Sequence, residues 1–161
     1  MTDYSIKKLD ILNKRLTELP DDIYKYTNLK ELYCYNNQIT SLDNLPPKLE
    51  VLCCWNNRLT SLDNLPQKLE VLYCSSNEIT SLDNLPPTLK QLNCGYNQIT
   101  SLDNLPPNLK ELDCNNNQLT SLDNLPPKLE ILYCIFNPLK YDCQPILQNI
   151  KNYNTSRILS S

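Results

Sequence analysis

The sequence of 161 residues has no histidine, no alanine and a single glycine, Gly95. Without histidine, it lacks the residue that most often serves as a general base and as a zinc ligand. With one glycine, it cannot form a glycine-rich loop that holds phosphate groups. These absences argue against an enzyme, and we expect no catalytic residue, no cofactor and no bound metal.

Basic residues are few and scattered along the chain. The 15 Lys and Arg residues are outnumbered by 18 Asp and Glu residues, giving a formal net charge of -3 and a pI of about 4.9. Such a chain offers no positive field to nucleic acid. No stretch approaches the roughly 18 apolar residues of a membrane span, and the first residues lack an apolar signal core. We expect a cytoplasmic, non-secreted protein that binds neither nucleic acid nor a membrane.

A repeat with a period of 20 residues organises the chain. The sequence Thr-Ser-Leu-Asp-Asn-Leu-Pro occurs five times, at 40–46, 60–66, 80–86, 100–106 and 120–126. Three other columns keep the same period: leucine from Leu32 to Leu132, cysteine from Cys34 to Cys134, and asparagine from Asn37 to Asn137. A fixed period of this length indicates a solenoid, in which each turn buries its apolar side against the next.

The repeat also divides the chain into segments. Apolar residues at helical spacing, Ile146, Leu147, Ile150 and Tyr153, predict a short C-terminal capping helix. The predicted segments are an N-terminal cap over 1–8, a divergent first repeat over 9–31, regular repeats over 32–137, a C-terminal cap over 138–153 and a tail over 154–161.

The repeated pattern Leu-x-x-Leu-x-Cys-x-x-Asn-x-(Ile/Leu), present over about residues 9–140, resembles the leucine-rich repeat family. Its length of 20 residues and the Leu-Pro-x-x-Leu segment resemble the short repeats of bacterial effector proteins. The Cys-x-x-Asn-Asn-Gln-(Ile/Leu)-Thr-Ser-Leu-Asp-Asn-Leu-Pro sequence resembles leucine-rich repeat proteins of giant viruses such as mimivirus. The viral resemblance implies a host interaction in the cytoplasm of an infected cell.

The fold class that follows is a leucine-rich repeat solenoid. Parallel strands are expected on the concave face and extended or short 3₁₀ segments on the convex side, because 20 residues leave little room for a convex helix. Strand residues alternate between faces, which places Leu32 and Cys34 inside and Tyr33 and Tyr35 outside. The asparagine column follows each strand, where a short amide can bridge the backbones of adjacent turns.

Two columns allow more than one interpretation. The inward cysteines behave as small hydrophobic residues, and adjacent turns lie within disulfide distance, although a cytosolic location favours free thiols. Cys53 differs from them because alternation places it outward, as a candidate accessible thiol. The aspartates from Asp43 to Asp123 either satisfy local turns or bind Ca²⁺ weakly between stacked carboxylates.

The outward strand positions vary between repeats, whereas the inward columns do not. Aromatic and branched residues gather in the first three regular repeats, and polar residues follow them. Tyr and Trp are enriched at interface hot spots, which favours partner binding centred on Trp55. The candidate partner-binding residues are Tyr33, Tyr35, Val51, Cys53, Trp55, Val71, Tyr73, Asn93, Asp113 and Tyr133.

The functional prediction is a non-catalytic module that binds a protein or peptide partner on its concave face. Three alternatives remain. The aromatic residues could simply pack across strands and stabilise the sheet. The patch could instead mediate a homodimer in a self-associating structural protein. Finally, the chain could be the recognition component of an effector system.

Overall fold

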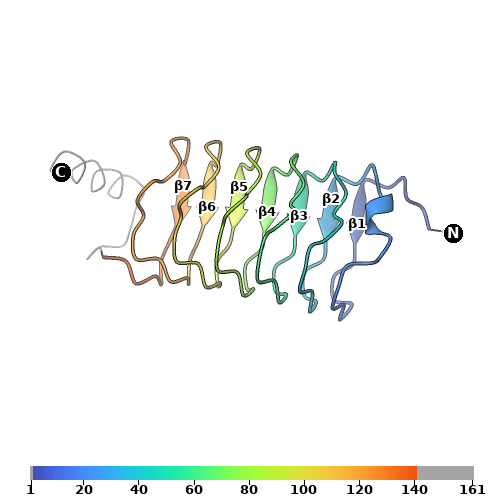
Figure 1. Cartoon of the computed structure of the whole chain (residues 1–161), viewed down its shortest axis with the longest axis horizontal. Coiled ribbons are helices and arrows are strands. Elements are labelled where there is room, and N and C mark those ends of the chain that lie inside the picture. The colour runs from blue at the N-terminus through green and yellow to red at the C-terminus, as the bar shows by residue number, and fades with distance from the viewer. Residues whose placement is uncertain (1, 141–161) are drawn as a thin grey trace.

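The computed structural model describes residues 2–140. Seven parallel strands of three residues each form one sheet, and they follow one another in chain order (Figure 1). The strands are β1 (Lys8–Asp10), β2 (Glu31–Tyr33), β3 (Val51–Cys53), β4 (Val71–Tyr73), β5 (Gln91–Asn93), β6 (Glu111–Asp113) and β7 (Ile131–Tyr133). The predicted solenoid of parallel strands is confirmed.

The leucine at the centre of each strand sets the register of the sheet. Leu32 pairs with Leu52, which in turn pairs with Leu72, so equivalent residues of successive repeats stand side by side. These leucines are fully buried, while most residues beside them in the strands are half-buried on the opposite face. A shift of one residue would expose the whole leucine column, so burial fixes this pairing.

The return path of each regular repeat is made of turns and extended segments. Pro46 is buried, and its carbonyl accepts a hydrogen bond from the Leu49 amide; Pro66, Pro86, Pro106 and Pro126 repeat this turn. Within residues 2–140 the only helix is the short 3₁₀ helix η1 (Ile23–Lys25), in the divergent first repeat. The expected convex side without α-helices is confirmed over the described repeats.

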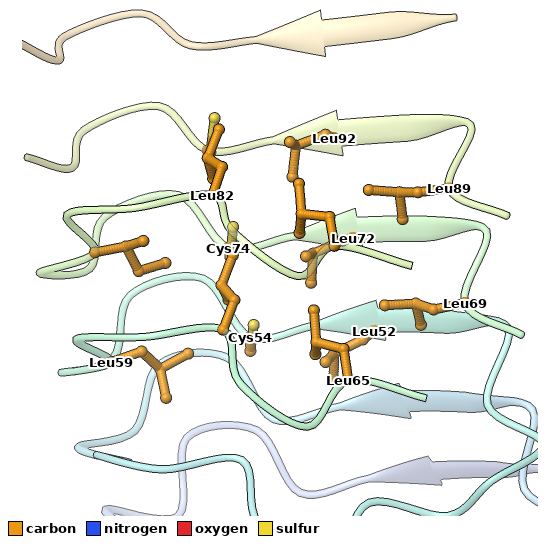
Figure 2. Close-up of a cluster of buried hydrophobic side chains, with 14 of the residues drawn as sticks. Leu52, Cys54, Leu59, Leu65, Leu69, Leu72, Cys74, Leu82, Leu89 and Leu92 are labelled. Atoms are coloured by element: carbon orange, nitrogen blue, oxygen red, sulfur yellow. The ribbon is translucent and has the colours of Figure 1, made fainter. Parts of the chain in front are cut away.

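The interior consists of leucine and cysteine columns stacked along the solenoid (Figure 2). Cys54, Cys74, Leu72 and Leu89 are fully buried, and equivalent side chains of neighbouring turns lie against one another. Each buried aliphatic side chain contributes about 1.5–3 kcal/mol. Because a turn alone cannot cover these residues, stability comes from contact between neighbouring turns.

The asparagine column connects adjacent turns through their backbones, as predicted. Asn77 Nδ2 donates to Cys54 O at 3.1 Å and to Cys74 O at 3.0 Å, and its Oδ1 accepts from Leu59 N at 3.0 Å. Asn57, Asn97 and Asn117 repeat this set of bonds. One side chain therefore bonds the buried backbones of two turns, and each cysteine carbonyl accepts from the asparagines of two successive repeats.

Asparagine also replaces glycine where the backbone adopts left-handed angles. Asn44 and its equivalents have φ near 60°, and Asn36, Asn56 and Asn116 have φ near 55°. Asparagine tolerates this region better than most residues because its short amide can bond locally. The scarcity of glycine thus reflects repeated use of asparagine at these turns.

The predicted capping helix lies outside the described residues, as does the predicted tail. Among the described residues, no helix has the length and apolar character required to cross a membrane.

Candidate functional site

Three outward rows, beginning at Glu31, Tyr33 and Tyr35 and recurring every 20 residues, form what we call the sheet face. The strand register places equivalent residues of successive repeats next to one another in each row. All ten predicted binding residues belong to these rows. Their common orientation follows from strand alternation, whereas their role in binding stays a prediction.

An aromatic platform stands over β2 and β3. The rings of Tyr35 and Trp55 are stacked, with centroids 4.4 Å apart and planes inclined by 11°. Such a pair contributes about 0.5–1.5 kcal/mol beyond its buried area and holds both rings in place. The platform therefore presents aromatic side chains that are already ordered, which lowers the entropic cost of binding.

Tyr33 is held beside this platform by polar contacts. Its hydroxyl donates to Glu31 Oε2 at 2.9 Å, and Lys8 Nζ lies 4.5 Å from its ring centroid. The hydrogen bond to Glu31, followed by burial, raises the pKa of Tyr33 to about 12. Tyr33 therefore stays neutral at physiological pH.

Tyr73 extends the aromatic surface onto β4. Its side chain is 37% exposed, and its hydroxyl donates to Gln91 Oε1 at 3.2 Å. Val51 and Val71 pair in register at the starts of β3 and β4, and both are half-buried. The six apolar and aromatic residues predicted for the first three regular repeats are thus brought together on neighbouring strands.

The prediction that Cys53 is an accessible thiol is wrong. Its side chain points to the sheet face as alternation requires, yet the residue is only 6% exposed. The register places this small side chain between the larger Tyr33 and Tyr73. Burial raises the pKa of Cys53 to about 11, so little of it is thiolate at neutral pH.

The middle of the sheet face carries small, polar side chains. Asn93 Nδ2 donates to Asp113 Oδ2 at 3.3 Å, so two predicted residues contact each other across β5 and β6. The Asp113 Oδ1 atom accepts from Asn115 N, and Asn93 Oδ1 accepts from Gly95 N. The side chains are thereby held in fixed orientations around Gly95.

Tyr133 lies far from the aromatic platform, at the other end of the described sheet. It is 51% exposed, next to Ile131, Ile135 and Phe136, which are exposed by 43%, 40% and 73%. Residues 141–153 of the predicted C-terminal cap lie outside the described residues. The structure therefore divides the predicted binding residues into an N-terminal group, the polar pair Asn93 and Asp113 in the middle, and Tyr133 on β7.

The sequence prediction omitted Tyr96, which is 62% exposed at the edge of the sheet face. Its φ of 53° lies in the left-handed region, at a column that holds asparagine in three of the six regular turns. A bulky residue is disfavoured there. Replacement of the column's asparagine by tyrosine was visible in the repeat alignment and could have marked this position.

A shallow depression of about 370 Å³ adjoins the sheet face where β4 to β7 begin. Two ion pairs lie along it, Lys90 Nζ to Glu70 Oε2 at 2.7 Å and Lys110 Nζ to Glu130 Oε1 at 3.2 Å. These exposed pairs contribute little stability. Its lining residues are Glu70, Val71, Lys90, Gln91, Lys110, Glu111, Glu130 and Ile131.

The aspartate column forms local turns. Asp103 Oδ2 accepts from Ser101 Oγ at 2.6 Å, and Asp103 Oδ1 accepts from Asn124 Nδ2 at 3.2 Å. These bonds lower the pKa of Asp103, with the serine as the main cause. Residues 2–140 contain no group of three or more side chains suited to hold a metal ion. The observed bonds support the turn interpretation, and calcium binding gains no support.

Fold and sheet face together define a class, the short-repeat parallel solenoid that displays variable residues on a constant framework. A model of the leucine-rich repeat family, which describes two copies of the repeat, matches residues 5–47, 47–87, 67–107 and 87–127. The chain therefore belongs to the leucine-rich repeat family.

Solved structures of bacterial proteins resemble the chain. YopM, a leucine-rich effector from Yersinia pestis, is 42% identical with a TM-score of 0.78, over 83% of this chain and 38% of YopM. A Shigella effector leucine-rich repeat domain is 28% identical with a TM-score of 0.73, over 97% of this chain and 77% of that domain. The InlJ domain from Listeria monocytogenes, described as including a cysteine ladder, is 32% identical with a TM-score of 0.65, over 93% of this chain and 39% of InlJ.

The chain thus spans well under half the length of YopM. No curated protein matches the chain. The predicted resemblance to bacterial effector repeats is confirmed, whereas the resemblance to giant-virus proteins stays a prediction.

Proposed function

We propose that this chain is a non-catalytic protein-interaction module that binds a protein or peptide partner on its sheet face. The observation that carries the proposal is the stacked pair of Tyr35 and Trp55, which lies in the variable rows and is ordered before any partner arrives. Aromatic residues of this kind dominate the binding energy of many interfaces. The effector proteins among the structural relatives support an interaction role.

The buried cysteines of the interior do not favour a catalytic role over binding. The thiols of Cys54, Cys94 and Cys114 are buried, and burial raises their pKa values well above the ordinary range. Such thiols are poor nucleophiles. The constant columns therefore hold the sheet face in place, and the proposal assigns recognition to the rows that vary. Host interaction in the cytoplasm belongs to the same proposal.

The test is affinity capture from a eukaryotic cell lysate with three forms of the protein. The first is wild type, and the second replaces Tyr33, Trp55 and Tyr73 by Ala. The third is Tyr24→Ala, a control because Tyr24 is an exposed aromatic residue (55%) within η1 and outside the sheet face. We expect a partner captured by wild type and Tyr24→Ala and lost with the triple variant, whose fold is checked by circular dichroism. Equal capture by all three forms would contradict the proposal.

Self-association is the second candidate, favoured by the exposed apolar side chains Ile131, Ile135 and Phe136 at β7. A concentration series in sedimentation velocity distinguishes it, because a homodimer shifts to larger sedimentation coefficients as concentration rises. A monomer throughout the series would exclude this candidate over the concentrations sampled.

A further inference from the structure

The aromatic platform of Tyr35 and Trp55 presents two hydrogen-bond donors that have no acceptor in the protein. Within residues 2–140, neither the Tyr35 hydroxyl nor Trp55 Nε1–H makes a hydrogen bond, although both side chains are half-buried. A partner that covers the platform removes water from these donors, so it must supply acceptors of its own. The platform therefore favours a partner that carries free carbonyl groups.

The strands beneath the platform leave few polar groups for a partner's backbone. Their own amides and carbonyls pair within the parallel sheet, as Cys34 N does with Cys53 O. The hydroxyls of Tyr33 and Tyr73 already donate to neighbouring side chains. A β-strand laid on this face would bury amide N–H groups that lack acceptors, and the carbonyls within a helix are already bonded. Proline suits the platform, because it lacks an N–H and keeps its carbonyl.

Tyr33 and Tyr73 are spaced like one turn of an extended proline helix. The register pairs each with Cys53, so the two tyrosines are two strands apart, roughly 9.6 Å at about 4.8 Å per strand. Polyproline II has three residues per turn and a rise of about 3.1 Å, so it repeats every ~9.3 Å. Side chains on one face of a β-strand recur every ~6.6 Å, which does not match. Cys53 is only 6% exposed, so the two rings are the contacts of this row.

The β1 end of the sheet face carries more negative than positive charge. In the register, Lys8 and Asp10 stand beside Glu31 and Tyr33, so they extend two rows of the face. Lys8 Nζ lies 3.9 Å from Glu31 Oε2, whereas Asp10 is exposed and forms no ion pair within residues 2–140. No position of the sheet face from β2 to β7 holds Lys or Arg. A basic residue in the partner complements this end.

We propose that the sheet face over β2 to β4 binds a proline-rich segment in polyproline II conformation, with an Arg or Lys residue at the end that lies over β1. The inference rests on the proposed function and specifies the partner's chemistry. The segment crosses the strands, and its prolines contact the rings of Tyr33 and Tyr73. Its carbonyls accept from the Tyr35 hydroxyl and Trp55 Nε1–H. Because polyproline II is stiff, the segment loses little conformational entropy when it binds.

The test selects peptides from a random twelve-residue library on the wild-type protein. A polyproline II segment of this length spans about 37 Å, which exceeds the three strand spacings from β1 to β4. We expect the selected peptides to share prolines three residues apart and an Arg or Lys near one end. Fluorescence anisotropy of labelled peptides gives their dissociation constants, and Trp55→Ala identifies the peptides that depend on the platform.

Two variants remove a single donor and keep an aromatic ring. Tyr35→Phe and Trp55→Phe should each raise the dissociation constants about tenfold, since each leaves a peptide carbonyl without its donor. Tyr24→Phe is the matched control, because it removes the same hydroxyl from an exposed tyrosine outside the sheet face. It should change the dissociation constants less than twofold. Circular dichroism verifies that each variant is folded.

A third variant tests the charge at the β1 end. Asp10→Asn should raise the dissociation constants about threefold at low salt and less at high salt, because the charge is exposed and screened. Asp21→Asn is the matched control, since Asp21 is an exposed carboxylate outside the sheet face.

Selected peptides that depend on Trp55 but lack regularly spaced prolines would overturn this inference and leave the proposed function standing. Unchanged binding to Tyr35→Phe and Trp55→Phe would do the same. Selection of no peptide that depends on Trp55 would also overturn it. The proposed function fails separately, when capture from lysate is the same for wild type and the triple variant.

Discussion

Leu72 and Tyr73 are neighbours in β4, yet they belong to two regions under opposite constraints. Leu72 is fully buried in the interior, where every regular repeat has leucine at the equivalent position. Tyr73 is 37% exposed on the sheet face, where the equivalent residues are Tyr, Cys, Asn or Asp. The interior tolerates little variation because each side chain must fit the turns on both sides. The sheet face can vary because its residues need only remain compatible with the strands.

The largest expected effect is a loss of stability at Leu72 that its neighbour Tyr73 does not share. Leu72→Ala should lower the free energy of unfolding by about 3 kcal/mol, because it removes buried methyl groups and leaves a cavity. Tyr73→Ala, the control in the same strand, should cost about 1 kcal/mol or less. Urea denaturation followed by circular dichroism measures both. Equal losses would contradict the expectation that the interior is more sensitive to substitution than the sheet face.

The second prediction compares one substitution in the two regions. Asn77→Ala should cost about 2–3 kcal/mol, since it leaves the buried Leu59 N–H without this acceptor and removes one of the two asparagine hydrogen bonds at each of two cysteine carbonyls. On the sheet face, Asn115 Oδ1 accepts a hydrogen bond from Ile135 N, so Asn115→Ala should cost about half as much or less. Thermal and urea unfolding of the two variants give the comparison. A larger loss at Asn115 would show that the asparagine column is not the main connection between turns.

Over the range from pH 9 to 10.5, the smallest effect concerns the buried thiols. Burial raises the pKa of Cys74 from 9.0 to about 12, so the unfolded chain releases this proton at lower pH than the folded chain does. Stability is therefore fully present below pH 9 and falls as the pH rises toward 12, by about 1.4 kcal/mol per pH unit for one such thiol.

Cys74→Ala removes this contribution, so its stability should decline less steeply than that of wild type between pH 9 and 10.5. Urea unfolding at a series of pH values measures the two slopes, and their difference isolates Cys74 from the tyrosines and lysines that titrate in the same range. Parallel slopes would mean that Cys74 ionises equally easily in both states.

The fold could be predicted in detail because the same residue types recur at the same positions of each repeat. Leu32, Cys34 and Asn37 recur in phase with their copies, and alternation along an extended strand fixes which of them point inward. The hydrogen-bonding role of Asn37 and its equivalents followed from the chemistry of a short amide at a turn. The site was predicted less completely, since orientation toward the sheet face does not establish exposure.

Cys53 and Gly95 show which features could not be predicted from the sequence. Each is a small residue whose surroundings include residues from a neighbouring turn. Cys53 is buried between Tyr33 and Tyr73, while Gly95 is buried where an added Cβ would lie 3.3 Å from Asn115 O and 3.4 Å from Asp113 Oδ1. Neither environment is visible within one repeat.

The sequence by itself determined the solenoid, the identity of its interior columns and the outward direction of the variable rows. These follow from a period of 20 residues and a strand alternation of two, both of which are properties of the backbone and its apolar pattern. Only the tertiary structure decided that Tyr35 stacks on Trp55, that Cys53 is covered and that Asp113 lies beside Gly95. Exposure and contact depend on the relative sizes of side chains brought together from different turns, and packing alone sets these.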